Sequence, residues 1–356
     1  MNVTFFIGNG FDINLGLSTS YSDFYKYCLS PEEQSTNKIQ RKIFDSIEKD
    51  IEGDGILWSD FEKGLGNFLG ELEVNDIPLF QEALINIKDI LSEYLKTETT
   101  KLKLISDQKE LTHIVTNSID NISKEFCPKD QQTIQKVFNT HKAESIKYNF
   151  LTFNYTDSLE QVIDQAFKGE KTIGSHRYSS DNYSHSIGQI IHMHGTFDNR
   201  MILGVNDISQ IKNEKLQNSE LLIHTFIKPI INDDCGQLIN ETAEQFINNS
   251  NILVVFGMSI GETDKKWWET ICNKMVNDGS CILLIFDLNK NCSRLHMEND
   301  FFYKKQLKDR LLKNANLPSK QQENVRNRIL IKFNSNKMFK VKIADFNEHK
   351  ELVGIT

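Results

Sequence analysis

Hydrophobic and polar positions along this chain follow two patterns, and the first predicts β-strands. Short, continuous apolar runs rich in β-branched and aromatic residues end at glycine or at polar side chains, which is typical of strands buried inside a parallel sheet. The clearest runs are "VTFFI" near the N-terminus, "NFLTF" at 149–153, "ILVVF" at 252–256 and "CILLIF" at 281–286. Further strands are expected in "QIIHMH", "ILIKF" and "FKVKIADF".

The second pattern predicts helices. No glycine occurs between Gly70 and Gly169, and apolar residues recur there every three or four positions, as in "LFQEALINIKDILSEYLKTE". This spacing indicates several amphipathic helices. Residues 54–72 and 298–328 have the same character. Ser20, followed three positions later by Asp23, predicts the start of a helix directly after the first loop.

Strand, glycine turn and helix follow one another repeatedly, which predicts an α/β fold. We expect a doubly wound parallel sheet with helices on both faces. The segment 30–148 interrupts this alternation and is expected to form a large helical insertion or cap. Residues 1–29 and 149–356 would then form the α/β domain.

Composition excludes some classes of function. The formal net charge is −8 over 356 residues, which opposes broad attraction to nucleic acid. The N-terminus lacks a signal peptide pattern, and the longest apolar run, 252–260, is about half the length of a membrane span. We therefore expect a cytoplasmic protein without direct nucleic-acid or membrane contacts. The six cysteines include no C-x-x-C pair, which predicts reduced thiols and no zinc site.

The loop "GNGFDINLG" after the first strand is a candidate phosphate-binding turn. In a parallel sheet, such a turn lets backbone N–H groups approach a pyrophosphate. Gly8 and Gly10 suit that role. The dinucleotide fingerprint G-x-G-x-x-G would need a third glycine where this chain has Ile13, so the loop is equally compatible with a plain tight turn.

Polar residues follow two other predicted strands. Asn154, Tyr155, Thr156 and Asp157 come after "FLTF", and His194 comes after "QIIHM". The carboxyl ends of parallel strands meet at one edge, so these side chains are expected to share a crevice with Gly8. The alternatives are ordinary: Asn154 and Asp157 are good helix caps, and a single histidine at a strand end is often structural.

Two further segments carry candidate polar groups. In "FGMSIGETD", Gly257 ends a strand and Ser259 and Asp264 follow, either as ligands or as a turn with a capping box. Glu62 in "WSDFE" could reach the crevice from the cap. We favour the alternative that Glu62 is a solvated acid on the protein surface.

Taken in order, "FFIGNGFDINLGLSTSYSDF", "WSDFE", "FLTFNYTDSLE", "HMHG", "ILG" at 202–204 and "FGMSIGETD" resemble the bacteriophage abortive-infection AbiH family. That family in turn is similar to a distant branch of the sirtuin fold. The resemblance implies a sirtuin-like, nucleotide-binding α/β domain. Paired C-x-x-C motifs of deacetylating sirtuins are missing, so protein deacetylation is not expected.

The resemblance also implies a site for NAD without a metal. His194-Gly195 matches a catalytic H-G pair, and residues 152–157 match T-Q-N-I-D with one additional residue before the acid. The catalytic residues implied are Asn154, His194 and Asp157. The residues implied to bind NAD are Gly8, Asn9, Gly10, Phe11, Asp12, Gly16, Ser20, Tyr21, Tyr155, Gly195, Gly257, Ser259 and Asp264.

The function implied is cleavage of the bond between nicotinamide and ribose in NAD, as a defence against phage infection. His194 would act as general base, Asn154 would position water or ribose, and Asp157 would steady the nicotinamide side. Two alternatives stay open: a defence protein that binds NAD or a related nucleotide without cleaving it, and a nucleic-acid-directed effector. The phage trigger is unidentified, and a homo-oligomer is possible.

Overall fold

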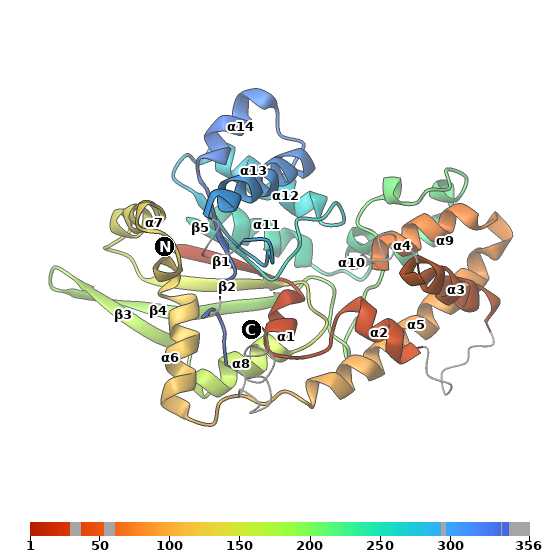
Figure 1. Ribbon diagram of the computed structural model, residues 1–356, viewed down its shortest axis with the longest axis horizontal. Helices are drawn as coiled ribbons and strands as arrows, with labels where there is room; N and C mark the ends of the chain where they lie inside the picture. Colours follow the sequence, from red (N-terminus) through yellow and green to blue (C-terminus); the bar gives the residue numbers. More distant parts are fainter. Residues whose placement is uncertain (29–36, 53–60, 293–296, 336, 342–356) are drawn as a thin grey trace, which may run out of the picture.

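The computed structural model of this protein describes residues 1–28, 37–52, 61–292, 297–335 and 337–341 (Figure 1). Its centre is a seven-stranded sheet in the order β3-β4-β2-β1-β5-β6-β7. All neighbours pair in parallel except β3, which forms an antiparallel hairpin with β4. The strands are β1 (Asn2–Ile7), β2 (Ile146–Thr152), β3 (Thr172–Tyr178), β4 (Asp181–His192), β5 (Ile252–Phe256), β6 (Ile282–Asp287) and β7 (Ile329–Phe333).

The order of the parallel strands confirms an α/β fold. Counted along the chain without β3, they lie in the order 3-2-1-4-5-6, which is the order of a doubly wound sheet. In such a sheet the chain reverses its winding direction beside β1. Ligands in folds of this kind bind outside the carboxyl ends of the strands at that point.

Alternate residues of the central strands face two separate hydrophobic cores. In β1, Phe5 and Ile7 belong to one core, and Phe6 belongs to the other. Phe5 stacks on Phe150 of β2 with ring centroids 5.0 Å apart. Because both faces are buried, the strands read as continuous apolar runs rather than alternating ones.

Helices cover both faces of the sheet (Figure 1). Hydrophobic residues of one set share the core of Phe5, and those of the other set share the core of Phe6. The first set is α1 (Gly10–Asn14), α6 (Gln108–Ile119), α7 (Pro128–Thr140) and α8 (Ser158–Phe167). The second set is α11 (Ile239–Asn249), α12 (Lys265–Asn277), α13 (Met297–Asn314) and α14 (Ser319–Arg326).

The remaining helices form a cap with a core of its own, to the right of the sheet in Figure 1. Residues of the predicted insertion, 30–148, therefore contribute to two cores, because α6 and α7 pack on the sheet while α3, α4 and α5 pack in the cap. Helices from beyond residue 148 complete the cap. Its members are α2 (Tyr21–Cys28), α3 (Lys38–Glu52), α4 (Phe61–Phe68), α5 (Ile77–Thr99), α9 (Glu220–Phe226) and α10 (Lys228–Asp234).

Several local predictions can be compared directly with the structure. Ser20 caps α2 as expected, since its Oγ accepts a bond from the Asp23 N–H at 3.2 Å. The helix predicted over 54–72 is present as α4 and a 3₁₀ turn, Leu69–Glu71, while 53–60 lie outside the described residues. The strand predicted in "FKVKIADF" was wrong for 339–341, which are not in a strand, and its remainder is not described.

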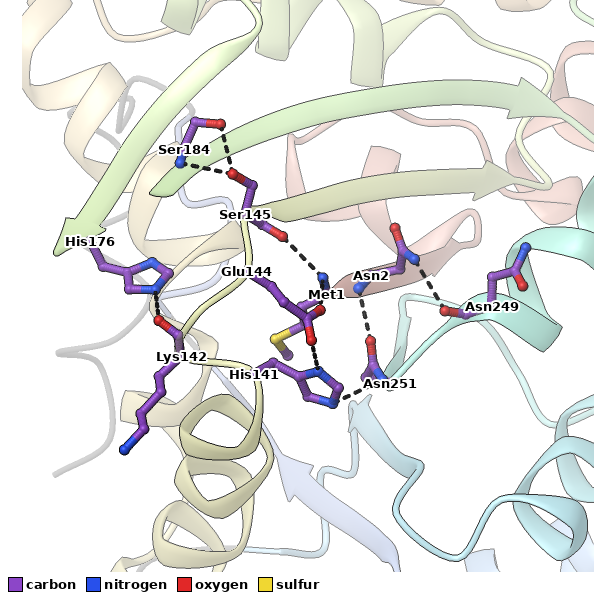
Figure 2. A network of polar contacts seen from close by, with 10 residues as sticks. All are labelled: Met1, Asn2, His141, Lys142, Glu144, Ser145, His176, Ser184, Asn249 and Asn251. Atoms are coloured by element: carbon purple, nitrogen blue, oxygen red, sulfur yellow. Dashed lines mark hydrogen bonds and ion pairs between the residues drawn. The ribbon is translucent and has the colours of Figure 1, made fainter. Parts of the chain in front are cut away.

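Figure 2 shows a polar network at the amino edge of the sheet, where β1 begins. The terminal ammonium of Met1 donates to Glu144 Oε2 at 2.7 Å and to the Ser145 carbonyl at 3.0 Å. His141 bonds the other oxygen of Glu144 at 2.9 Å and the Asn251 carboxamide at 3.1 Å. These contacts join the segments that precede β2 and β5 to the start of β1. They lie at the amino edge of the sheet, opposite the carboxyl edge.

No helix in the described part of the chain is both long enough and apolar enough to cross a membrane.

Candidate functional site

A small cavity lies at the carboxyl edge of the sheet, where β1 and β2 end beneath the cap. Its volume is about 60 Å³. Six residues predicted from the sequence line it together: Asn9, Asp12, Tyr21, Asn154, Tyr155 and Thr156. The other lining residues are Thr19, Leu91, Leu95 and Phe153. This volume has room for one or two water molecules but is far smaller than the roughly 300–1,000 Å³ typical of ligand pockets.

Asn154 is the most unusual side chain of this cavity. It is only 5% exposed, and its carboxamide makes no hydrogen bond of normal length and angle among the described residues, although it lies close enough to the Asp12 carboxylate to lower the pKa of that group. Leaving a buried polar group unpaired costs about 1–3 kcal/mol. Its backbone, in contrast, is held at both ends, because the N–H donates to Thr152 Oγ1 at 3.3 Å and the carbonyl accepts from His192 Nδ1 at 3.1 Å. A fixed backbone that carries an unpaired, buried carboxamide is typical of a ligand site.

Asp12 supplies a titratable group to the same cavity. Its carboxylate is 1% exposed and accepts hydrogen bonds from the hydroxyls of Thr156, at 2.7 Å, and Ser158. Burial raises the pKa of Asp12 to about 6, although the two hydroxyls and the Asn154 side chain lower it. A carboxyl group with that pKa can accept or release a proton near neutral pH.

The glycine loop packs against the turn after β5. The Gly10 N–H donates to the Gly257 carbonyl at 2.7 Å, and a Cβ on Gly10 would lie 2.6 Å from Gly257 Cα. Gly257 itself has a φ of +67°, which favours glycine. These glycines therefore allow close contact of two turns, and the N–H of Gly10 is already used within the protein. Contact of Gly8 and Gly10 with a pyrophosphate stays a prediction.

The neighbouring Asn9 and Phe11 stabilise the loop in different ways. Asn9 exchanges two side-chain bonds with Thr19, at 2.9 and 2.6 Å, and so ties the loop to the segment that precedes α2. Phe11 is fully buried in the sheet core, with its ring edge-on to Phe339 at a centroid distance of 5.2 Å. Phe11 is thus placed as a core residue beneath the site.

A buried ion pair between two cap helices contacts this edge of the sheet through Tyr155. Lys228 Nζ of α10 lies 2.5 Å from Glu62 Oε2 of α4, and the Tyr155 hydroxyl donates to Glu62 Oε1 at 3.1 Å. Glu62 is 7% exposed and Lys228 only 1%. The expectation that Glu62 is a solvated surface acid was therefore wrong, because its carboxylate is paired inside the protein.

His194 lies behind Tyr155 and does not line the cavity. Its ring is edge-on to Phe153, at a centroid distance of 5.5 Å, and 6.2 Å from the ring of Tyr155. Burial, with a further contribution from Lys228, holds the pKa of His194 well below its usual range. The imidazole is therefore neutral at physiological pH and can act as a proton acceptor.

A second histidine supports Asn154 from behind. His192 Nδ1 bonds the Asn154 carbonyl, and Nε2 bonds Glu160 Oε1 at 2.7 Å. The carbonyl and the ionised carboxylate are both acceptors, so this arrangement favours the doubly protonated ring. Burial lowers the pKa of His192, but Glu160 and the Asn154 carbonyl outweigh it and raise the pKa overall.

The other predicted residues lie near this edge but are not among those that line the cavity. Asp157 Oδ1 accepts a bond from Gln161 Nε2 at 2.9 Å, one turn into α8. Ser20 caps α2, Ser259 is exposed, and Asp264 precedes α12. Gly16 and Gly195 adopt positive φ angles of 81° and 72° in turns.

Sequence reasoning missed Thr19, Lys228 and the pair of His192 and Glu160. Lys228 and Glu160 occur in ordinary helical patterns, and no local signal marks them as buried partners. His192 stands in "HMHG" beside the predicted His194, so this motif could have indicated a second functional histidine. Among the side chains that the structure describes, no three His, Cys, Asp or Glu residues are grouped to hold a metal ion.

The fold and this edge define an α/β protein with a helical cap over a polar, buried cavity at the carboxyl ends of parallel strands. The chain belongs to the family described as bacteriophage abortive infection AbiH, whose model matches residues 4–286. This confirms the resemblance to the AbiH family and supports a role in abortive infection, while the sirtuin-like relationship stays a prediction. No curated protein matches the chain.

Proposed function

We propose that this protein defends against phage by cleaving the bond between nicotinamide and ribose in NAD. The observation that carries the proposal is the unpaired, buried carboxamide of Asn154 beside Asp12 and Tyr21. Support also comes from the place of this cavity, at the edge where a doubly wound sheet binds nucleotides. The sirtuin-like motifs around Gly8, Asn154 and His194 suggest NAD as the nucleotide.

NAD enters this site only when the cap moves. The cavity of about 60 Å³ is closed on the cap side by Leu91 and Leu95 of α5. These leucines also belong to the cap core, so α5 and its neighbours would move together. The described arrangement would then be the closed form of the protein, in which the Asn154 carboxamide is not yet bonded to NAD.

Three side chains would share the chemistry once the cap has moved. Asn154 would orient the ribose or the attacking water through its carboxamide. His194 would accept a proton from a ribose hydroxyl or from water, since burial keeps it neutral. Asp12 is a second candidate base, because it lines the cavity already and has a pKa of about 6. A direct role for Asp157 stays a prediction.

The test is release of nicotinamide from NAD by the full-length protein, measured by chromatography. Asn154→Ala and His194→Ala should each lower turnover by about 10²–10⁴-fold, as expected for loss of a positioned polar or acid–base group. Asn182→Ala, an exposed asparagine on the β3–β4 hairpin, is the control and should leave turnover unchanged. Full turnover in both site variants would refute the assignment.

The second candidate function is binding of NAD or a related nucleotide without cleavage. The position of His194 favours it, because Phe153 and Tyr155 separate this histidine from the cavity. Calorimetry with NAD distinguishes the two functions. Binding that needs Asn154 but releases no nicotinamide would identify a sensor, and absence of both binding and release would overturn both candidates.

A further inference from the structure

A second, larger cavity lies beside the first, between the loop that follows β4 and the helices α10 and α11. Its volume is about 340 Å³, within the range of roughly 300–1,000 Å³ typical of small-molecule pockets. His192 lines this second cavity, while its Nδ1 bonds the carbonyl of Asn154. The two cavities therefore lie on either side of the contact between His192 and Asn154.

Asn232 provides an unpaired acceptor at the second cavity. The side chain is 3% exposed, and its Nδ2 donates to the Met193 carbonyl at 3.5 Å, which sets the orientation of the carboxamide. The remaining oxygen, Oδ1, has no hydrogen-bond partner in the described parts of the chain. A buried carbonyl oxygen of this kind is satisfied by a hydroxyl or amino donor from a ligand.

Arg200 provides a cation at the same cavity. Its guanidinium donates to the neutral side chain of Gln237, whose own backbone N–H bonds the Asn232 carbonyl at 2.9 Å. No ion pair of Arg200 occurs among the described residues, and the described residues that line the cavity include no Asp or Glu. The charge of His192, in contrast, is balanced by Glu160. A guanidinium without an acidic partner suits a phosphate group, which it can bind in bidentate fashion.

Four apolar side chains also line the cavity: Met201, Ile202, Ile231 and Ile239. Gly195, Thr196, Asn199 and Cys235 complete the lining. The four apolar side chains offer a surface on which a flat ring can pack, as is usual in pockets that combine an apolar wall with a few polar groups.

We propose that this second cavity binds a nucleoside monophosphate. Arg200 holds the phosphate, the apolar wall contacts the base, and Asn232 Oδ1 accepts a bond from a hydroxyl or amino group of the ligand. The site is separate from the cavity of Asn154. The proposal goes beyond NAD cleavage and does not depend on it.

The experiment is isothermal titration calorimetry of the full-length protein with AMP, adenosine, ribose 5-phosphate and inorganic phosphate. AMP should bind tightest, because only AMP uses both the cation and the apolar wall. Arg200→Gln should weaken AMP binding by about 10–100-fold, the effect of one charge-assisted contact. Asn232→Leu should weaken AMP binding about tenfold, because it removes the acceptor Oδ1. It also removes the bond from Nδ2 to the Met193 carbonyl, so its melting temperature is measured alongside, and Arg200→Gln tests the site without changing this bond.

Two control variants make the result specific to this cavity. Arg177→Gln removes an exposed arginine from β3 and should leave AMP affinity unchanged. Asn154→Leu changes only the first cavity and should also leave AMP affinity unchanged. The proposal is overturned if AMP fails to bind at 10 mM in roughly physiological salt, or if Arg200→Gln binds AMP as well as the wild type. It is also overturned if ribose 5-phosphate matches AMP, or if Asn154→Leu abolishes AMP binding.

Discussion

Removal of the Lys228 ammonium should destabilise the protein strongly. In Lys228→Met the Glu62 carboxylate, 7% exposed, loses the cation that lies 2.5 Å away. Breaking a buried pair by removing one partner costs about 3–5 kcal/mol, because the other charge stays buried without compensation. The bond from the Tyr155 hydroxyl persists and compensates only part of this loss.

Removal of both charges should be far less harmful. The double variant Glu62→Leu, Lys228→Met leaves no uncompensated charge, and such replacements are often neutral or even stabilising. Tyr155 loses one acceptor but keeps the Ile202 carbonyl at 2.9 Å. We therefore expect the double variant to be more stable than Lys228→Met alone by about 2 kcal/mol or more.

An adjacent residue provides the control. Lys63 pairs with Glu262 at 2.7 Å, but the two side chains are 46% and 59% exposed. Surface pairs of this kind contribute about 0–1 kcal/mol, so Lys63→Met should change stability by no more than that. The comparison separates the effect of burial from the effect of losing a lysine.

The assay is urea unfolding at pH 7, followed by far-UV circular dichroism and by tryptophan fluorescence. Two of the three tryptophans, Trp267 and Trp268, are buried beside the sheet, so fluorescence reports mainly on the sheet, whereas circular dichroism also detects the cap helices. A loss below about 1 kcal/mol in Lys228→Met, or a double variant as unstable as the two single variants combined, would contradict the reasoning.

Three further predictions follow from the site. Burial raises the pKa of Asp12 from 3.8 to about 6. Protonation of Asp12 therefore stabilises the fold by about 3 kcal/mol below pH 3.8, and this contribution is lost as the pH rises through 6. Asp12→Asn should abolish that part of the pH dependence in urea unfolding. The pKa of His192 is raised in the folded protein, so protonation of His192 stabilises the fold below pH 6.5, and this contribution is lost as the pH rises through the folded-state pKa. Glu160→Gln should therefore flatten the dependence of the unfolding free energy on pH above 6.5. Gly10→Ala should cost about 1–3 kcal/mol, because its Cβ would meet Gly257 backbone, whereas Gly279→Ala, with no atom within 4 Å, should be nearly neutral in thermal unfolding.

Much of the sheet could be predicted from the sequence because its central strands are buried on both faces. Burial of this kind requires continuous apolar residues, and it makes "VTFFI" and "ILVVF" visible without any partner. Helical periodicity shows that one face of a helix is buried, but not against what. The sequence therefore did not show that α6 and α7 cover the sheet while α5 belongs to the cap.

The same contrast applies to the site: some of its residues could be predicted from the local sequence, whereas others are brought together only by the fold. Asn154 lies two residues after β2, so the parallel topology places it at the carboxyl edge, whereas Asp12 lies in the short helix α1 after the glycine loop and was expected there only from the family resemblance. Glu62 and Lys228 are 166 positions apart, and each is ordinary in its own helix. Only the folded structure shows that they pair, and only the folded structure places the ring of His194 beside that of Tyr155.

A structure of the full-length protein with bound ADP-ribose tests the central claim most directly. ADP-ribose contains the pyrophosphate and ribose of NAD and needs no turnover to be seen. We predict that its ribose contacts the Asn154 carboxamide, and that α5 with Leu91 and Leu95 moves away from the glycine loop to admit it. ADP-ribose bound elsewhere, with Asn154 still enclosed and unpaired, would contradict the account.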